Sequence, residues 1–132
     1  MAWIAPHPLS WIGKPSVGSG ECVALVEAAA AAMPRSGEWS RGVPMQGNMS
    51  IPFGTIIATF GANGRYGSTT DGSSHAAIYF GQTTEGIIVI DQWNLYKNHV
   101  IIGRQPPHKR LIRFKNPHGK PVDIGTNYYV VE

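Results

Sequence analysis

The chain has 132 residues, of which 42% are hydrophobic and 14% charged, and its formal net charge is +3. This length suits one domain with its own hydrophobic core, so we predict a single domain over residues 1–132. The single cysteine excludes an internal disulfide and a zinc site built from several cysteines, and no apolar run reaches the roughly 18 residues of a membrane-spanning helix.

The first residues, Met1–Pro8, lack the basic start and the long apolar stretch of a secretory signal. We therefore expect a protein that is cytoplasmic as synthesised, or that is exported without a cleavable signal to act in the periplasm. The mildly basic charge suits an anionic partner such as a cell-wall polymer. We expect no membrane partner.

One helix is predicted, over residues 21–33. The region before it is rich in proline and glycine, which predicts a loop. Ser19 is the expected N-cap, the alanines favour a helix, and Pro34 ends it. The spacing i, i+3, i+4, i+7 predicts that one face of this helix packs on the rest of the molecule and carries Cys22, Leu25, Val26 and Ala29.

Short strands are predicted beyond a loop at residues 34–52, because apolar and β-branched runs alternate with turn residues. A short polar connection between two of these runs predicts an antiparallel hairpin. The fold class is therefore α+β, with an N-terminal helix packed on an antiparallel sheet of five to six strands. The expected strands cover residues 54–60, 75–81, 86–93, 100–104, 109–114 and 127–131.

Cys22 is the candidate nucleophile. It follows the flexible stretch Gly18–Gly20 and opens the predicted helix, where free backbone N–H groups and the helix dipole favour a thiolate. Its own N–H is also placed to stabilise an oxyanion. The alternative is that Cys22 is a small buried side chain that contributes only to packing.

His75 is the candidate base. It ends a polar loop and opens a strand, which puts it at the end of a sheet, where loops and active sites gather. Its imidazole needs an acceptor, and Asp91 and Gln92 lie opposite if the two strands pair as a hairpin. Adjacent strand residues point to opposite faces, so only one of them can face His75. We favour Asp91, because a carboxylate fixes the tautomer and stabilises the imidazolium.

Four blocks of sequence resemble, in their order and spacing, the CHAP and NlpC/P60 cysteine peptidases: Gly20–Val26, Pro52–Ala58, His75–Tyr79 and Ile88–Asn94. The resemblance implies a papain-like fold and a bacterial enzyme that cleaves amide bonds in peptidoglycan through a thioester. It implies Cys22 as nucleophile, His75 as general base and Asp91 as the orienting third residue. It implies no cofactor.

Glu21 departs from the CHAP pattern, in which glutamine often precedes the cysteine. A carboxylate beside the thiol is expected to raise its pKa and weaken its attack. The small catalytic domain also resembles the amidase effectors of type VI secretion, which implies an immunity protein as a partner. Which amide bond is cut stays open.

A rival interpretation is a non-catalytic papain-like module that binds peptide or glycan in the same groove. In either case the substrate-binding surface is expected to contain aromatic and amide side chains. The residues predicted for it are Trp39, Tyr66, Gln92 and Trp93.

Two further alternatives concern a metal and nucleic acid. A metal site would use His75, Asp71, Asp91 and His99, but no ligand spacing such as His-x-x-x-His supports it, so we expect no metal. A run of basic residues could bind nucleic acid, but its alternation suits an exposed edge strand, so we expect no nucleic-acid partner. These basic residues are Arg104, His108, Lys109, Arg110, Arg113 and Lys115.

Overall fold

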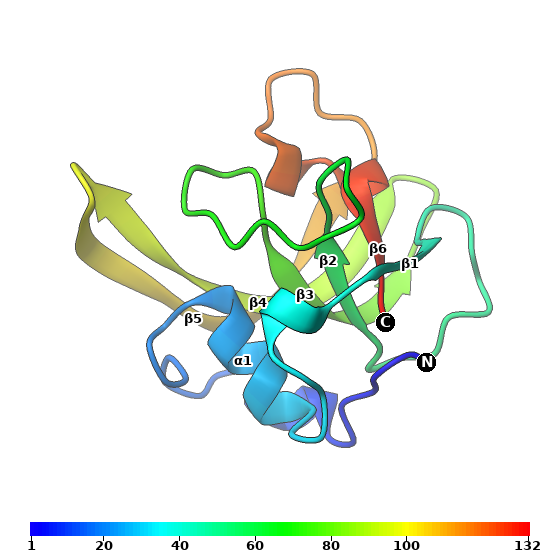
Figure 1. Ribbon diagram of the computed structural model, residues 1–132, viewed down its shortest axis with the longest axis horizontal. Helices are drawn as coiled ribbons and strands as arrows, with labels where there is room; N and C mark the ends of the chain where they lie inside the picture. The colour runs from blue at the N-terminus through cyan, green and yellow to red at the C-terminus, as the bar shows by residue number, and fades with distance from the viewer.

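The computed structural model describes residues 1–132 and consists of one antiparallel sheet with a helix against one face (Figure 1). The sheet has six strands in the order β1-β6-β2-β3-β4-β5. Their bounds are Arg41–Pro44 (β1), Ile56–Thr59 (β2), Ala76–Gln82 (β3), Gly86–Lys97 (β4), Val100–Arg113 (β5) and Tyr128–Val131 (β6). The helices are Pro8–Trp11 (η1), Cys22–Ala29 (α1), Ser36–Glu38 (η2), Pro121–Asp123 (η3) and Gly125–Asn127 (η4), of which only α1 is an α-helix. The predicted α+β class is confirmed.

Helix α1 is shorter than the predicted span of residues 21–33, because Ala30 already leaves the helical conformation. The predicted N-cap is wrong. Glu21 occupies that position in an extended conformation, and its own N–H donates to Ser19 Oγ over 3.3 Å. The buried face of the helix is the predicted one, with Cys22, Leu25, Val26 and Ala29.

The strands build one apolar layer on each face of the sheet. The layer between helix and sheet includes Leu25, Val26, Ile56, Ile78 and Ile90. The layer on the opposite face includes Ile57, Ala77, Tyr79, Val89 and Ile112. Because successive strand residues alternate between faces, Asp91 continues the face of Val89 and Gln92 continues that of Ile90.

The predicted hairpin of residues 75–81 and 86–93 is present as β3 and β4, with Ile78 paired to Ile90. A second, longer hairpin joins β4 to β5, and its tip projects beyond the rest of the molecule (Figure 1). This hairpin extends β4 to Lys97 and carries one wall of the pocket described below.

The strands predicted at residues 100–104 and 109–114 are one continuous strand, β5. The gap between the two predicted strands contains Pro106 and Pro107, and proline cannot donate to a strand ladder. They are accommodated because β5 lies at the edge of the sheet and its register shifts beside them.

Strand β1 was not predicted, because its four residues are mostly exposed and form no apolar run. It pairs with β6 and forms the other edge of the sheet. None of the helices combines the length and hydropathy needed to cross a bilayer.

Candidate active site

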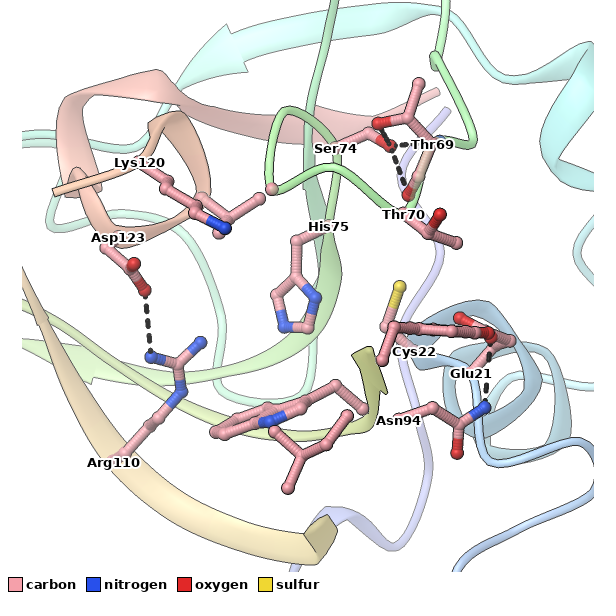
Figure 2. Close-up of a pocket in the computed structure, with 15 residues that line it drawn as sticks. Glu21, Cys22, Thr69, Thr70, Ser74, His75, Asn94, Arg110, Lys120 and Asp123 are labelled. Carbon is pink, nitrogen blue, oxygen red and sulfur yellow. Dashed lines mark hydrogen bonds and ion pairs between the residues drawn. The ribbon is translucent and has the colours of Figure 1, made fainter. Parts of the chain in front are cut away.

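A pocket of about 430 Å³ lies where the start of α1 meets the beginning of β3 and the middle of β4 (Figure 2). It brings the predicted nucleophile and base together with charged and amide side chains from three other segments. Its wall includes Cys22, His75, Trp93, Asn94, Arg110 and Lys120.

Cys22 is the first residue of α1, and its side chain is 8% exposed. Its Sγ lies 3.4 Å from the hydroxyl oxygen of Tyr66. In the close-up the side chain of Cys22 lies beside the imidazole of His75 (Figure 2). The first N–H groups of a helix have no acceptor within it, so the Cys22 N–H can donate to an oxyanion formed beside the sulfur.

His75 directly precedes β3 and is held by Thr59 of β2 on both sides of its backbone. The His75 N–H donates to Thr59 Oγ1 over 3.0 Å, and the Thr59 N–H donates to the His75 carbonyl over 3.0 Å. Its Nε2 lies 2.7 Å from Asp91 Oδ2, and Asp91 has no exposed surface. This contact occupies Nε2 and leaves Nδ1 to face the thiol of Cys22.

The three groups shift one another's pKa. Burial raises the pKa of the Cys22 thiol, but the charge of His75 and hydrogen bonds with His75 and Tyr66 bring it below its ordinary value. Burial lowers the pKa of His75, whereas the Cys22 thiolate and Asp91 raise it to about 10. Burial raises the pKa of Asp91, but His75 and Arg110 hold it below its usual range. A thiolate, an imidazolium and a carboxylate are therefore favoured together.

Asp91 and Gln92 were the two candidates for the partner of His75. Asp91 makes this contact, and Gln92 lies on the other face of β4. The Gln92 side chain binds the backbone that leads into α1: its Oε1 accepts from the Val17 N–H over 2.8 Å, and its Nε2 donates to the carbonyls of Val17 and Glu21 over 3.0 and 2.7 Å.

The pKa of Cys22 is lowered overall even though the Glu21 carboxylate is its neighbour in the chain. Glu21 Oε1 accepts hydrogen bonds from Asn94 Nδ2, over 3.0 Å, and from the hydroxyl of Tyr96. These bonds to β4 hold the carboxylate at the pocket wall.

The predicted substrate-binding residues divide into two groups. Trp39 and Gln92 have no exposed surface, which contradicts the prediction that they contact substrate. The ring of Trp39 packs against the ring of Tyr66, with ring centroids 5.0 Å apart. The Trp39 Nε1–H donates to the Pro34 carbonyl. Trp93 lines the pocket, and Tyr66 touches the sulfur of Cys22, so both stay candidates.

Three residues at the pocket were not predicted as site residues. Arg110 was assigned to an exposed basic strand, but it binds the buried Asp91 carboxylate. Asn94 holds both the Glu21 carboxylate and the Ser19 carbonyl. Lys120 reaches the pocket because its aliphatic chain lies across Gly72. The sequence held a signal for Arg110 alone: alternation along β4 and β5 puts Asp91 and Arg110 on one face.

The residues considered for a metal do not form a ligand cluster, and no group of three or more His, Cys, Asp or Glu side chains is arranged to hold a metal ion. Asp71 lies in an exposed loop and accepts from the N–H of Ser73. His99 lies at the tip of the β4–β5 hairpin.

The family model described as domesticated amidase effector 2 matches residues 5–131. A solved structure titled type 6 secretion amidase effector 2 (Tae2) superposes with a TM-score of 0.80 at 31% sequence identity, covering 98% of this chain and 94% of that one. The predicted resemblance to amidase effectors is thus confirmed. The likeness to the CHAP and NlpC/P60 blocks stays a prediction.

Two relatives support the same assignment. A type VI secretion amidase effector 2 protein of Salmonella typhi is 51% identical over 55 residues, which are 42% of this chain and only 40% of that protein. Domesticated amidase effector 2 of Ixodes scapularis is 36% identical over 131 residues, covering 96% of this chain and 81% of its own length. The chain belongs to the domesticated amidase effector 2 family.

Proposed function

We propose that this chain is a cysteine amidase that hydrolyses an amide bond in peptidoglycan. Cys22 is the nucleophile, His75 the general base and acid, and Asp91 the group that orients His75. The observation that carries the proposal is the buried contact of His75 with Asp91, at 2.7 Å, beside a thiol of lowered pKa in a pocket. Membership of a family named for amidase effectors supplies the substrate class.

The reaction proceeds through a thioester. The Cys22 thiolate attacks the amide carbonyl carbon, and the resulting oxyanion accepts a hydrogen bond from the Cys22 N–H. The C–N bond breaks as the imidazolium of His75 gives its proton to the leaving amine. His75 then takes a proton from a water molecule, whose oxygen attacks the thioester. The C–S bond breaks, the carboxylic acid leaves, and the thiolate–imidazolium pair is restored.

Asp91 acts through His75. A carboxylate on Nε2 holds the ring with Nδ1 toward the sulfur and stabilises the imidazolium. Trp93 forms the apolar part of the pocket wall against which a peptide would lie, and Tyr66 donates to the thiolate. We propose that the enzyme reaches its polymer outside the cytoplasm and that a producing bacterium needs an immunity protein against it.

Digestion of purified peptidoglycan, followed by mass spectrometry of the soluble fragments, tests the proposal. The wild-type chain is expected to release fragments that carry a new amine and a new carboxyl group. Cys22→Ala and His75→Ala should each lower the rate by at least about a thousandfold. Lys115→Ala is the matched control, because Lys115 is exposed and outside the pocket.

The rival interpretation, a module that binds without cleaving, predicts a different result. Such a protein would sediment with peptidoglycan and release no fragments, and Cys22→Ala would bind as well as the wild type. In addition, an activated Cys22 should react with iodoacetamide at pH 6 much faster than free cysteine does. Equal reaction rates together with absent fragments would contradict the proposed catalysis.

A further inference from the structure

The buried Asp91 carboxylate binds two cationic side chains at once. His75 Nε2 lies 2.7 Å from Oδ2. On the other side, Arg110 donates through Nε to Oδ1 and Oδ2 over 3.2 and 2.9 Å, and its second nitrogen, Nη2, lies 2.8 Å from Oδ2. A forked guanidinium fixes both the position and the plane of a carboxylate, which a single contact with His75 does not.

Arg110 is itself held in place. Its side chain is 22% exposed, and its guanidinium carbon lies 4.7 Å from the ring centre of Trp93, over the ring. A further nitrogen, Nη1, lies 3.7 Å from Asp123 Oδ1, an ion pair that is partly exposed and therefore screened. The same guanidinium thus contacts the residue that orients His75 and the aromatic wall of the pocket.

The charges of the cluster explain what Arg110 adds. The charges of Arg110 and Asp91 cancel. The site therefore carries no net charge in either of two states: Cys22 as thiol with His75 as neutral imidazole, or Cys22 as thiolate with His75 as imidazolium. Without Arg110 both of these states would carry one uncompensated negative charge in a buried place. In that case a thiol beside an imidazolium and the Asp91 carboxylate would be neutral as a group. Ionising the thiol would give the group a net negative charge, which burial opposes.

Other side chains also face this cluster, and all of them are kept in the variants of Arg110. His108 Nδ1 donates to the Asp91 carbonyl over 3.2 Å and lies 3.9 Å from Asp91 Oδ1. The Tyr128 hydroxyl donates to the Val122 carbonyl over 2.8 Å. The titratable and charged groups around Asp91 and His75 come from several elements: Cys22 from α1, Tyr66 from the loop before β3, His108 from β5, Asp123 from η3 and Tyr128 from β6, with Glu21 and Lys120 at the wall of the same pocket.

We propose that Arg110 is a positioning residue of the active site, which fixes the Asp91 carboxylate against His75 and compensates its charge while the proton moves between thiol and imidazole. This inference rests on the proposed function for its place in catalysis. Its effect on the thiol can be measured without any substrate.

Replacing Arg110 with glutamine should raise the pKa of both Cys22 and His75, because a nearby cation favours the thiolate and disfavours the imidazolium. A charge within a few ångströms moves a pKa by roughly 1–3 units, and Arg110 acts across Asp91, so we expect about one unit. At a pH below the midpoint, alkylation of Cys22 should then be about tenfold slower.

The test measures the rate of iodoacetamide alkylation from pH 4 to 10 in the wild-type chain and three variants. Arg110→Gln should shift the midpoint upward by about one unit. Arg110→Lys keeps the charge without the fork, so its midpoint should stay closer to that of the wild type while kcat on peptidoglycan falls. Arg113→Gln is the matched control: Arg113 lies on the same strand, pairs with Glu85 over 3.0 Å and is well exposed.

Far-UV circular dichroism shows whether the variants are folded. An unshifted midpoint in folded Arg110→Gln overturns the inference, as does an equal shift in Arg113→Gln. If Arg110→Gln does not fold, Arg110→Lys decides: an unchanged kcat overturns the positioning role, and a lowered kcat with an unchanged KM supports it. A wild-type chain that cleaves no peptidoglycan but shows the Arg110-dependent midpoint would contradict the proposed function and still support the effect of Arg110 on the thiol.

Discussion

Gln92→Leu tests whether the buried amide of Gln92 holds the start of α1. The side chain has no exposed surface and makes three hydrogen bonds to backbone groups that precede Cys22. Leucine has a similar volume and can make none of them. The substitution should therefore weaken the fold and also loosen the position of the nucleophile.

The size of the effect follows from which groups lose their partners. Three hydrogen bonds at about 1 kcal/mol each give about 3 kcal/mol. The Val17 carbonyl keeps the N–H of Gly20 as donor, at 3.0 Å, and the Glu21 carbonyl keeps that of Ala24, at 3.2 Å. Only the Val17 N–H is left without a partner, and the apolar leucine regains part of the loss by its burial. We expect the free energy of unfolding to fall by about 2 kcal/mol.

Urea unfolding followed by tryptophan fluorescence measures this change, and alkylation of Cys22 at pH 6 measures the effect on the nucleophile. The control is Gln82→Leu, because Gln82 makes a comparable set of bonds to residues 45–48 at the far end of β3. Both variants should lose similar stability, but only Gln92→Leu should slow alkylation. An unfolding free energy equal to that of the wild type, or equal slowing in Gln82→Leu, would refute the reasoning.

Three other substitutions have defined outcomes. Asp91→Asn should lower the free energy of unfolding by about 3 kcal/mol at pH 7. Because folding lowers the pKa of Asp91, the carboxylate stabilises the fold above pH ~4, and this stabilisation is lost as the pH falls. The urea unfolding curves of the variant and the wild type should therefore converge in acid. Tyr66→Phe removes a hydrogen bond to the thiolate and should slow alkylation of Cys22 at pH 6 about fivefold, with little change at pH 10. Gly20→Ala should lower the melting temperature measured by circular dichroism. Gly20 has φ of +86°, and a Cβ there would meet the buried side chain of Asn94. An unchanged melting temperature would contradict this and show that the turn can adapt.

The sequence was sufficient to predict the contact between His75 and Asp91. Two features of the sequence support this prediction. A polar loop ends where a strand begins at His75, and along the neighbouring strand only one of two adjacent residues can face the imidazole. Both features are local, and the hairpin that joins them is short. The start of α1 at Cys22 was predictable for the same reason, from the glycines before it.

The role of Arg110 could not be predicted in this way. Its contact with Asp91 depends on the register between β4 and β5, which shifts between Asp91 and Trp93. The shift lies beside Pro106 and Pro107, in the gap between the two strands that were predicted where β5 is continuous. Burial of Trp39 was also beyond the sequence, because it depends on a loop between α1 and β1 that folds over Tyr66.

The single, buried Cys22 has a consequence for the redox chemistry of the protein. An oxidant that reaches the thiolate would convert it to a sulfenic acid, and the chain holds no second thiol that could resolve it as a disulfide. Recovery therefore depends on an external thiol small enough to reach a sulfur that is only 8% exposed. The lowered pKa that prepares Cys22 for attack thus also makes its sulfur sensitive to oxidation.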